Sequence, residues 1–138
     1  MIIVIGTDII DIRRIEKTIQ KYGEKFKKRC FSINEIKRSD NQFNSANSYA
    51  KRYAAKEACS KALGTGLSRG IFWKDIEVKN NIHGKPSIIL HNNALNRINK
   101  IANKDYRIEV SLSDERNYAI ANVIILEEWK LSAIFLTI

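Results

Sequence analysis

The feature that most constrains the fold is an apolar segment close to the N-terminus. Residues 2–10 read Ile-Ile-Val-Ile-Gly-Thr-Asp-Ile-Ile and are almost all β-branched. A run of this kind predicts a buried strand rather than a surface helix. Its one acidic residue is Asp8, whose ionised carboxylate needs a cation, a metal or backbone donors to offset desolvation. Asp8 therefore either caps the strand end or serves a metal or catalytic site.

The remaining pattern predicts an α+β protein in which helices pack on an antiparallel sheet. Asp11 is placed to cap a helix, Ser32 and Glu35 form a capping box, and Gly64 stands where a helix commonly ends. Helices are predicted from Asp11 to about residue 21 and over about 33–38, 48–63 and 92–102. A hairpin is predicted over 75–79 and 86–90, and further strands over about 107–112 and 118–126. The segment 39–47 is predicted to be a loop, and 64–70 a turn. Residues 1–138 are expected to form a single domain.

Composition narrows the class of protein further. The 138 residues contain 44% hydrophobic and 28% charged residues, six Gly and one Pro, which excludes collagen-like and disordered chains. No apolar stretch is long enough to span a membrane, and no basic region precedes the N-terminal apolar run, so we expect neither a membrane span nor a signal peptide. Cys30 and Cys59 lack metal-ligand spacing and indicate a reduced, cytoplasmic location.

Positive charge is concentrated in the first half of the chain. The net charge is +9, of which residues 1–69 contribute +8 and residues 70–138 contribute +1. This asymmetry indicates a partner rich in phosphate or carboxylate, or else a solvated basic surface.

The predicted helix over 48–63 carries residues that are able to do chemistry. Tyr53, Glu57 and Lys61 are spaced i, i+4 and i+8, so they share one helix face. An isolated Glu–Lys pair at this spacing is usually a surface feature worth a few tenths of a kcal/mol. Small residues occupy the neighbouring face and allow close packing on a sheet: Ala54, Ala55, Ala58 and Ala62.

If this helix packs on the first strand, the two segments make a site for a diphosphate. Asp8 and Glu57 would then be two oxygen ligands for Mg²⁺, which completes its shell with water and phosphate oxygens. Lys61, one turn beyond Glu57, would hold a phosphate oxygen next to the turn Gly64-Thr65-Gly66.

The sequence resembles the holo-acyl-carrier-protein synthases, the small bacterial 4′-phosphopantetheinyl transferases. The resemblance covers about residues 1–126 in order, and the helix segment that ends in Gly-Thr-Gly is its most specific part. The tail over 127–138 lies outside it, and we expect residues 129–138 to add a strand or cover a core. The matching residues are Gly6-Thr7-Asp8, Asp11, Arg14, Arg52-Tyr53-Ala54-Ala55-Lys56-Glu57-Ala58, Lys61-Ala62-Leu63-Gly64-Thr65-Gly66, Gly84-Lys85-Pro86, Ser111-Leu112-Ser113 and Tyr118-Ala119.

The resemblance implies an activity, with coenzyme A as co-substrate and Mg²⁺ as cofactor. The enzyme would transfer 4′-phosphopantetheine from coenzyme A to a serine of apo acyl carrier protein, in fatty acid biosynthesis, and release adenosine 3′,5′-bisphosphate. Asp8 and Glu57 would hold Mg²⁺, Glu57 or a metal-bound water would be the base, and Lys61 would neutralise the leaving phosphate. The residues expected around the nucleotide phosphates are Arg52, Lys61, Gly64, Thr65, Gly66, Lys85 and Pro86.

The resemblance also implies partners. The acidic carrier protein would dock on a cationic helix face made of Arg13, Arg14, Lys17 and Lys21. Members of the family are typically homotrimers with active sites between subunits, so a monomer is expected to be inactive. Many members have Ser-His-Thr where this chain has Ser113-Asp114-Glu115. Asp114 does not donate a proton at neutral pH, so we expect it to accept a hydrogen bond or add a metal ligand.

Two other functions compete with the transferase. A basic nucleic-acid-binding module would fit the charge, but only Phe26, Phe31 and Phe43 accompany the cations and no nucleic-acid motif is present, so no nucleic-acid partner is expected. A degenerate relative that binds carrier protein without catalysis would fit the Asp114 departure.

Overall fold

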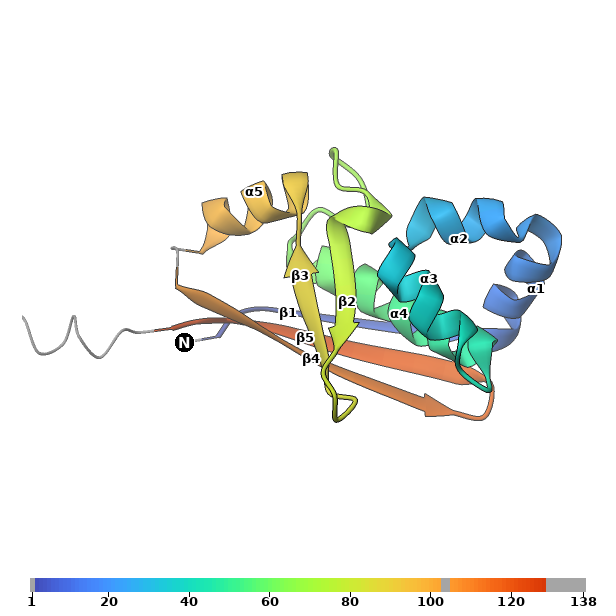
Figure 1. The fold of residues 1–138 in the computed structure, drawn as a ribbon. Coiled ribbons are helices and arrows are strands. Elements are labelled where there is room, and N and C mark those ends of the chain that lie inside the picture. The colour runs from blue at the N-terminus through green and yellow to red at the C-terminus, as the bar shows by residue number, and fades with distance from the viewer. Residues whose placement is uncertain (1, 103–104, 129–138) are drawn as a thin grey trace, which may run out of the picture.

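The computed structural model describes residues 2–102 and 105–128 as two sheets with helices packed between and beside them (Figure 1). The elements in chain order are β1 (Ile2–Asp11), α1 (Ile12–Tyr22), α2 (Glu24–Cys30), α3 (Ile33–Asp40), α4 (Ser45–Ala62), a 3-10 turn (Trp73–Asp75), β2 (Ile76–Asn80), β3 (Pro86–Leu90), α5 (Asn92–Ile101), β4 (Tyr106–Glu115) and β5 (Tyr118–Glu127). The predicted α+β class is confirmed.

The larger sheet has three antiparallel strands in the order β1-β5-β4. Asp8 on β1 lies opposite Ala121 on β5, which in turn lies opposite Leu112 on β4. The long helix α4 packs on one face of this sheet, and the β2–β3 hairpin lies on the other side of α4 (Figure 1). Helix α4 is therefore the central element of the fold.

The close approach of α4 to β1 depends on Gly6. A Cβ placed on Gly6 would lie 1.9 Å from the carbonyl oxygen of Ala58, so only glycine fits there. The alanines at 54, 55, 58 and 62 are all buried against the sheet. This packing confirms the predicted small-residue face and explains how a strand and a helix far apart in sequence meet closely enough to share a site.

Most predicted elements are present, with two corrections. The structure forms an additional helix, α2, in which Phe26 and Cys30 are the residues turned toward the interior. The predicted loop over 39–47 is too long, because α3 continues to Asp40 and α4 begins at Ser45. Asn44 caps α4 by accepting a hydrogen bond from the Asn47 amide at 3.2 Å, which stabilises a first turn made of weak helix formers. The predictions for residues 129–138 lie outside the described residues.

The outer face of the three-stranded sheet is open and carries exposed isoleucines on β1. Ile5 and Ile9, which alternate with the α4-facing residues of β1, are 61% and 60% exposed. Within residues 2–102 and 105–128, no helix covers this face (Figure 1). Nor is any described helix both long and apolar enough to cross a membrane.

Candidate active site

Asp8, Glu57 and Lys61 meet where β1 packs on α4. The Lys61 ammonium donates to the Asp8 carboxylate at 2.8 Å and to the carbonyl of Thr7 at 3.1 Å. Asp8 is largely buried whereas Lys61 is half-exposed, so the ion pair sits at the mouth of the site. The long-range convergence predicted from the sequence is present for these three residues.

The pKa of Glu57 is shifted by its burial and by the charged groups around it. Partial burial raises the pKa of Glu57, and the nearby Asp8 carboxylate raises it further, while Lys61 and Arg14 oppose the shift. A carboxylate whose charged form is disfavoured by burial and by a neighbouring negative charge is stabilised when a cation lies next to it. Because the charge of Arg14 on α1 acts on Glu57, the predicted docking helix lies close to the carboxylates.

The donor set fits a divalent cation that keeps open positions. Among the described residues, no three His, Cys, Asp or Glu side chains gather closely enough to enclose a metal by themselves. Asp8 and Glu57 would supply two hard oxygen ligands, which is the usual protein contribution to Mg²⁺ when substrate phosphate supplies the rest.

A second site lies on the opposite edge of the sheet, beside β4. It is a cleft of about 550 Å³ between α4, the β2–β3 hairpin and β4. Its lining includes three cations and no carboxylate. The lining residues are Arg38, Gln42, Phe43, Asn44, Asn47, Ser48, Lys51, Arg52, Asn80, Gly84, Pro86, Val110, Ser111 and Leu112.

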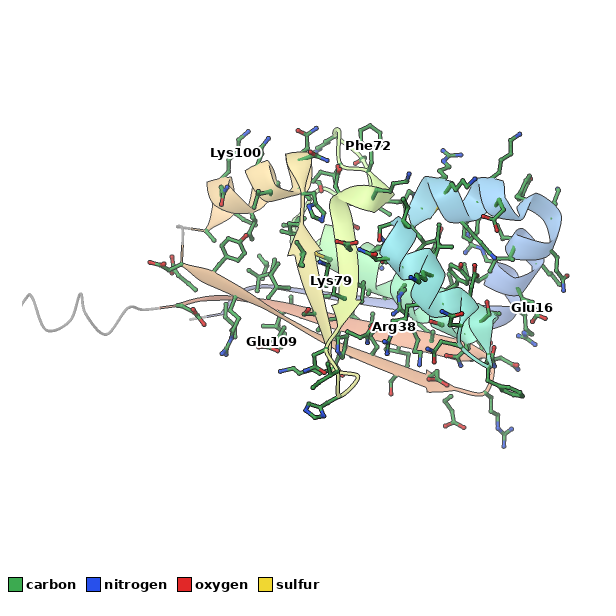
Figure 2. All side chains as sticks on the ribbon, viewed as in Figure 1. Glu16, Arg38, Phe72, Lys79, Lys100 and Glu109 are labelled. Atoms are coloured by element: carbon green, nitrogen blue, oxygen red, sulfur yellow. The ribbon has the colours of Figure 1, made fainter. Side chains whose placement is uncertain are left out.

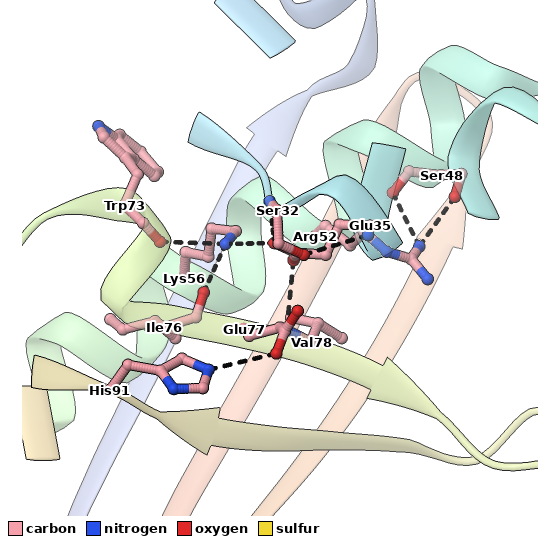
Figure 3. Close-up of polar contacts among 10 residues, drawn as sticks. All are labelled: Ser32, Glu35, Ser48, Arg52, Lys56, Trp73, Ile76, Glu77, Val78 and His91. Carbon is pink, nitrogen blue, oxygen red and sulfur yellow. Dashed lines mark hydrogen bonds and ion pairs between the residues drawn. The ribbon is translucent and has the colours of Figure 1, made fainter. Parts of the chain in front are cut away.

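Arg52 is the most informative residue of this cleft. Its side chain is only 4% exposed, and it donates to the Ser48 hydroxyl at 2.8 Å and to the Asn80 amide oxygen at 2.6 Å (Figure 3). Its Nε has no hydrogen-bond partner, and burial lowers its pKa. A buried guanidinium that faces a cleft without a carboxylate partner indicates an anion site.

Asp114 borders the same cleft, but its carboxylate already has partners within the chain. Its carboxylate accepts a hydrogen bond from Asn47 at 2.9 Å and pairs with Lys51 at 3.2 Å. The Asn47 hydrogen bond and the Lys51 charge lower its pKa, so it is ionised at neutral pH. Asp114 therefore orients two cleft residues of its own chain.

The other predicted phosphate ligands are divided among separate places. Pro86 lines the cleft with Arg52, whereas Lys85 is exposed and pairs loosely with Glu109 at 3.8 Å. Thr65 lines a different depression, beside α5. Gly64 and Gly66 adopt the left-handed conformation that the predicted turn requires. One copy of the chain does not bring all these residues together.

The predicted docking residues do form one surface. They line a shallow depression of about 480 Å³ on α1. Arg13 is tied to the helix-capping Asp11 at 2.7 Å, whereas no carboxylate among the described residues pairs with the others, Arg14, Lys17 and Lys21.

One buried feature was not anticipated from the sequence. Lys56 and Glu35 form an ion pair at 2.8 Å with both side chains fully buried, and Lys56 also donates to the carbonyls of Trp73 and Ile76 (Figure 3). Glu35 appeared in the sequence only as part of a capping box. The sequence could have indicated a buried cation, because Lys56 lies among alanines on α4. It could not have identified the partner, because Glu35 lies 21 residues away.

Comparison with known proteins identifies the family of this chain. Residues 4–123 match the 4′-phosphopantetheinyl transferase superfamily. A holo-[acyl-carrier-protein] synthase of Agrobacterium fabrum is 53% identical over 127 residues, which cover 91% of this chain and 95% of that protein. The crystal structure of the Neisseria meningitidis synthase matches with a TM-score of 0.80 at 32% identity, covering 92% of this chain and 100% of that one. The Helicobacter pylori synthase in complex with coenzyme A matches with a TM-score of 0.77 at 32% identity, covering 88% and 99%.

The chain therefore belongs to the 4′-phosphopantetheinyl transferase superfamily and is a transferase of that class. Within this class, these relatives are holo-acyl-carrier-protein synthases, which confirms the resemblance seen in the sequence.

Proposed function

We propose that this enzyme transfers 4′-phosphopantetheine from coenzyme A to a serine of apo acyl carrier protein and depends on Mg²⁺. The observation that carries the proposal is the convergence of Asp8, Glu57 and Lys61. Glu57 and Lys61 come from the most specific segment of the resemblance, and Asp8 comes from its first strand. The carrier substrate places the reaction in fatty acid biosynthesis. The two free cysteines support a reducing cytoplasm as its location.

In the reaction, the serine oxygen forms a bond to the phosphorus that carries pantetheine, and the bridging oxygen leaves with adenosine 3′,5′-bisphosphate. Glu57, whose pKa is raised, is the residue of this chain placed to accept the serine proton. Lys61 gives up part of its pairing with Asp8 and compensates charge on the leaving phosphate. When Mg²⁺ is bound by Asp8 and Glu57, it supplies charge neutralisation at the diphosphate.

The cleft between α4, the β2–β3 hairpin and β4, called the β4-edge cleft from here on, is the proposed site for the nucleotide part of coenzyme A. Arg52 brings a buried guanidinium to the wall of the cleft, where its charge would attract a phosphate, and Lys51 adds a second cation whose position Asp114 holds. Lys85 extends from the hairpin next to the cleft residues Gly84 and Pro86, and it is largely solvent-exposed. These residues fit a polyanionic ligand because three cations line the cleft, of which Lys51 pairs with a bordering carboxylate, that of Asp114.

We further propose a homotrimer with active sites between subunits. The carboxylates lie at the β1 edge and the anion cleft at the β4 edge, so a neighbouring copy is needed to join them. The open face that carries Ile5 and Ile9 is the apolar surface for this contact. Light scattering should give three times 15.9 kDa, and Ile5→Glu with Ile9→Glu should give inactive monomers.

The direct test is to incubate the protein with apo acyl carrier protein, coenzyme A and Mg²⁺ and to weigh the carrier by mass spectrometry. We expect the carrier to gain one phosphopantetheine, and Glu57→Gln to slow this by about 100-fold or more. Glu16→Gln, an exposed change on α1, is the matched control (Figure 2). Carrier binding without an adduct would instead indicate a degenerate relative. Activity that survives EDTA would refute the metal site.

A further inference from the structure

Phe43 is an aromatic residue that the fold does not use. It lies between α3 and α4, and its ring is fully exposed, at 109% of the reference value. The large aromatic cluster of the protein, in which Phe26, Phe31, Tyr49, Tyr53 and Trp73 pack ring on ring, does not include it. Leaving such a ring in water forgoes the stabilisation that its burial would give.

The position of Phe43 coincides with the rim of the β4-edge cleft. Its sequence neighbours Gln42 and Asn44 line the same cleft. The backbone amide of Gln42 donates to the Ser39 carbonyl, but among the described residues no hydrogen-bond partner contacts its side-chain amide, whose donor and acceptor are both available. An aromatic face beside a free side-chain amide is the chemistry that recognises a nucleobase, because every base has a π-face and polar edges.

The anion-binding part of the cleft lies on α4 and the hairpin. Arg52 is held there by Ser48 and Asn80 with its Nε unpaired. The cleft volume of about 550 Å³ lies within the range of small-ligand sites, roughly 300–1,000 Å³. Phosphate anchors on one wall and an aromatic ring on the rim match the two ends of a nucleotide.

We propose that Phe43 is a specificity-determining residue that stacks on the adenine base of the donor. This inference rests on the proposed function, since it names the nucleotide of coenzyme A as the ligand of the cleft. Stacking at Phe43 would make the enzyme depend on the nucleoside of its donor as well as on the diphosphate.

The test measures the affinity of the full-length assembly for adenosine 3′,5′-bisphosphate by isothermal titration calorimetry. Removal of one stacking ring is expected to weaken binding by about 10- to 100-fold in Phe43→Ala. Phe43→Trp should keep the affinity because it keeps a ring. Phe72→Ala is the matched control, since Phe72 is also exposed but lies well away from the Arg38 wall of the cleft (Figure 2).

A second probe, inorganic pyrophosphate, separates base recognition from phosphate binding. We expect Phe43→Ala to leave the pyrophosphate affinity unchanged and Arg52→Ala to weaken both ligands. Equal weakening of both ligands in Phe43→Ala would overturn the inference. A changed assembly mass with unchanged nucleotide affinity would assign Phe43 to a subunit contact and also overturn it.

The outcomes distinguish this inference from the proposed function. Full carrier modification with unaltered nucleotide affinity in Phe43→Ala would refute stacking and leave the transferase intact. Wild-type protein that neither binds the nucleotide nor modifies the carrier would refute both.

Discussion

The buried ion pair of Lys56 with Glu35 offers the most quantitative test of how α4 is held. The change is Lys56→Met, which keeps the length and apolar stem of the side chain but removes the ammonium. Both side chains of the pair are 0% exposed, so water cannot replace the lost contact. Lys56 donates to Glu35 at 2.8 Å, to the Trp73 carbonyl at 3.0 Å and to the Ile76 carbonyl.

The magnitude follows from what the substitution leaves behind. Glu35 would retain two donors, the amides of Ser32 at 2.9 Å and Val78 at 3.2 Å, but it would lose its ion-pair partner, and the nearby Arg52 would be left as a more distant positive charge. Removing one partner of a buried pair destabilises a protein by about 3–5 kcal/mol. For a domain of total stability about 5–15 kcal/mol this is a large fraction, and it predicts a fall in Tm of roughly 10–20 °C.

The assay is urea unfolding followed by tryptophan fluorescence, with two companion variants. Lys56→Met combined with Glu35→Gln should be more stable than Lys56→Met alone, because the uncompensated charge is gone. Lys61→Met removes a half-exposed pair and should cost about 1 kcal/mol or less while abolishing transfer. A loss below about 1 kcal/mol in Lys56→Met, or no gain in the double variant, would refute the reasoning.

Three further predictions follow from the fold and the site. Gly6→Ala should destabilise the protein by several kcal/mol in urea unfolding, because its Cβ would collide with backbone of α4; a stability within 0.5 kcal/mol of wild type would show that β1 and α4 shift apart freely. Arg14→Glu should raise the KM for carrier protein about 10-fold or more at low salt with little change in the KM for coenzyme A, and the reverse pattern would misplace the docking surface. Burial raises the pKa of Cys30 to about 11 and of Cys59 to about 12, so both thiols should resist iodoacetamide at pH 8 until the protein unfolds; rapid labelling of native protein would contradict their burial.

Local signals in the sequence predicted most of the elements and the chemistry of the carboxylate site. The apolar run over residues 2–10 became β1, the Ser32–Glu35 capping box starts α3, and Gly64 follows α4. These features depend on residues close in the chain, so their physical cause is visible in the sequence. The prediction of a loop over 39–47 was wrong in part, because α4 begins at Ser45, where the Asn44 side chain caps it.

The roles of individual polar residues depended on contacts that no local pattern records. Lys56 and Glu57 are neighbouring charged residues of one helix, and the sequence does not distinguish their environments. In the structure, Lys56 is buried in the core whereas Glu57 faces the site. Arg52 was expected at the nucleotide phosphates and Asp8 at the metal, yet in one copy of the chain they lie at opposite edges of the sheet.

The sequence by itself determined the α+β class, the helix and strand types, and the residue types able to bind a metal and a phosphate. Only the tertiary structure decided which of them meet: Asp8 with Lys61, Glu35 with Lys56, and Arg52 with Asn80. Each of these pairs joins residues more than 20 positions apart, so its existence depends on how α4 packs between the sheet and the hairpin. Helix propensity and capping act over a few residues, whereas that packing is set by steric fit at Gly6 and burial along the whole of α4.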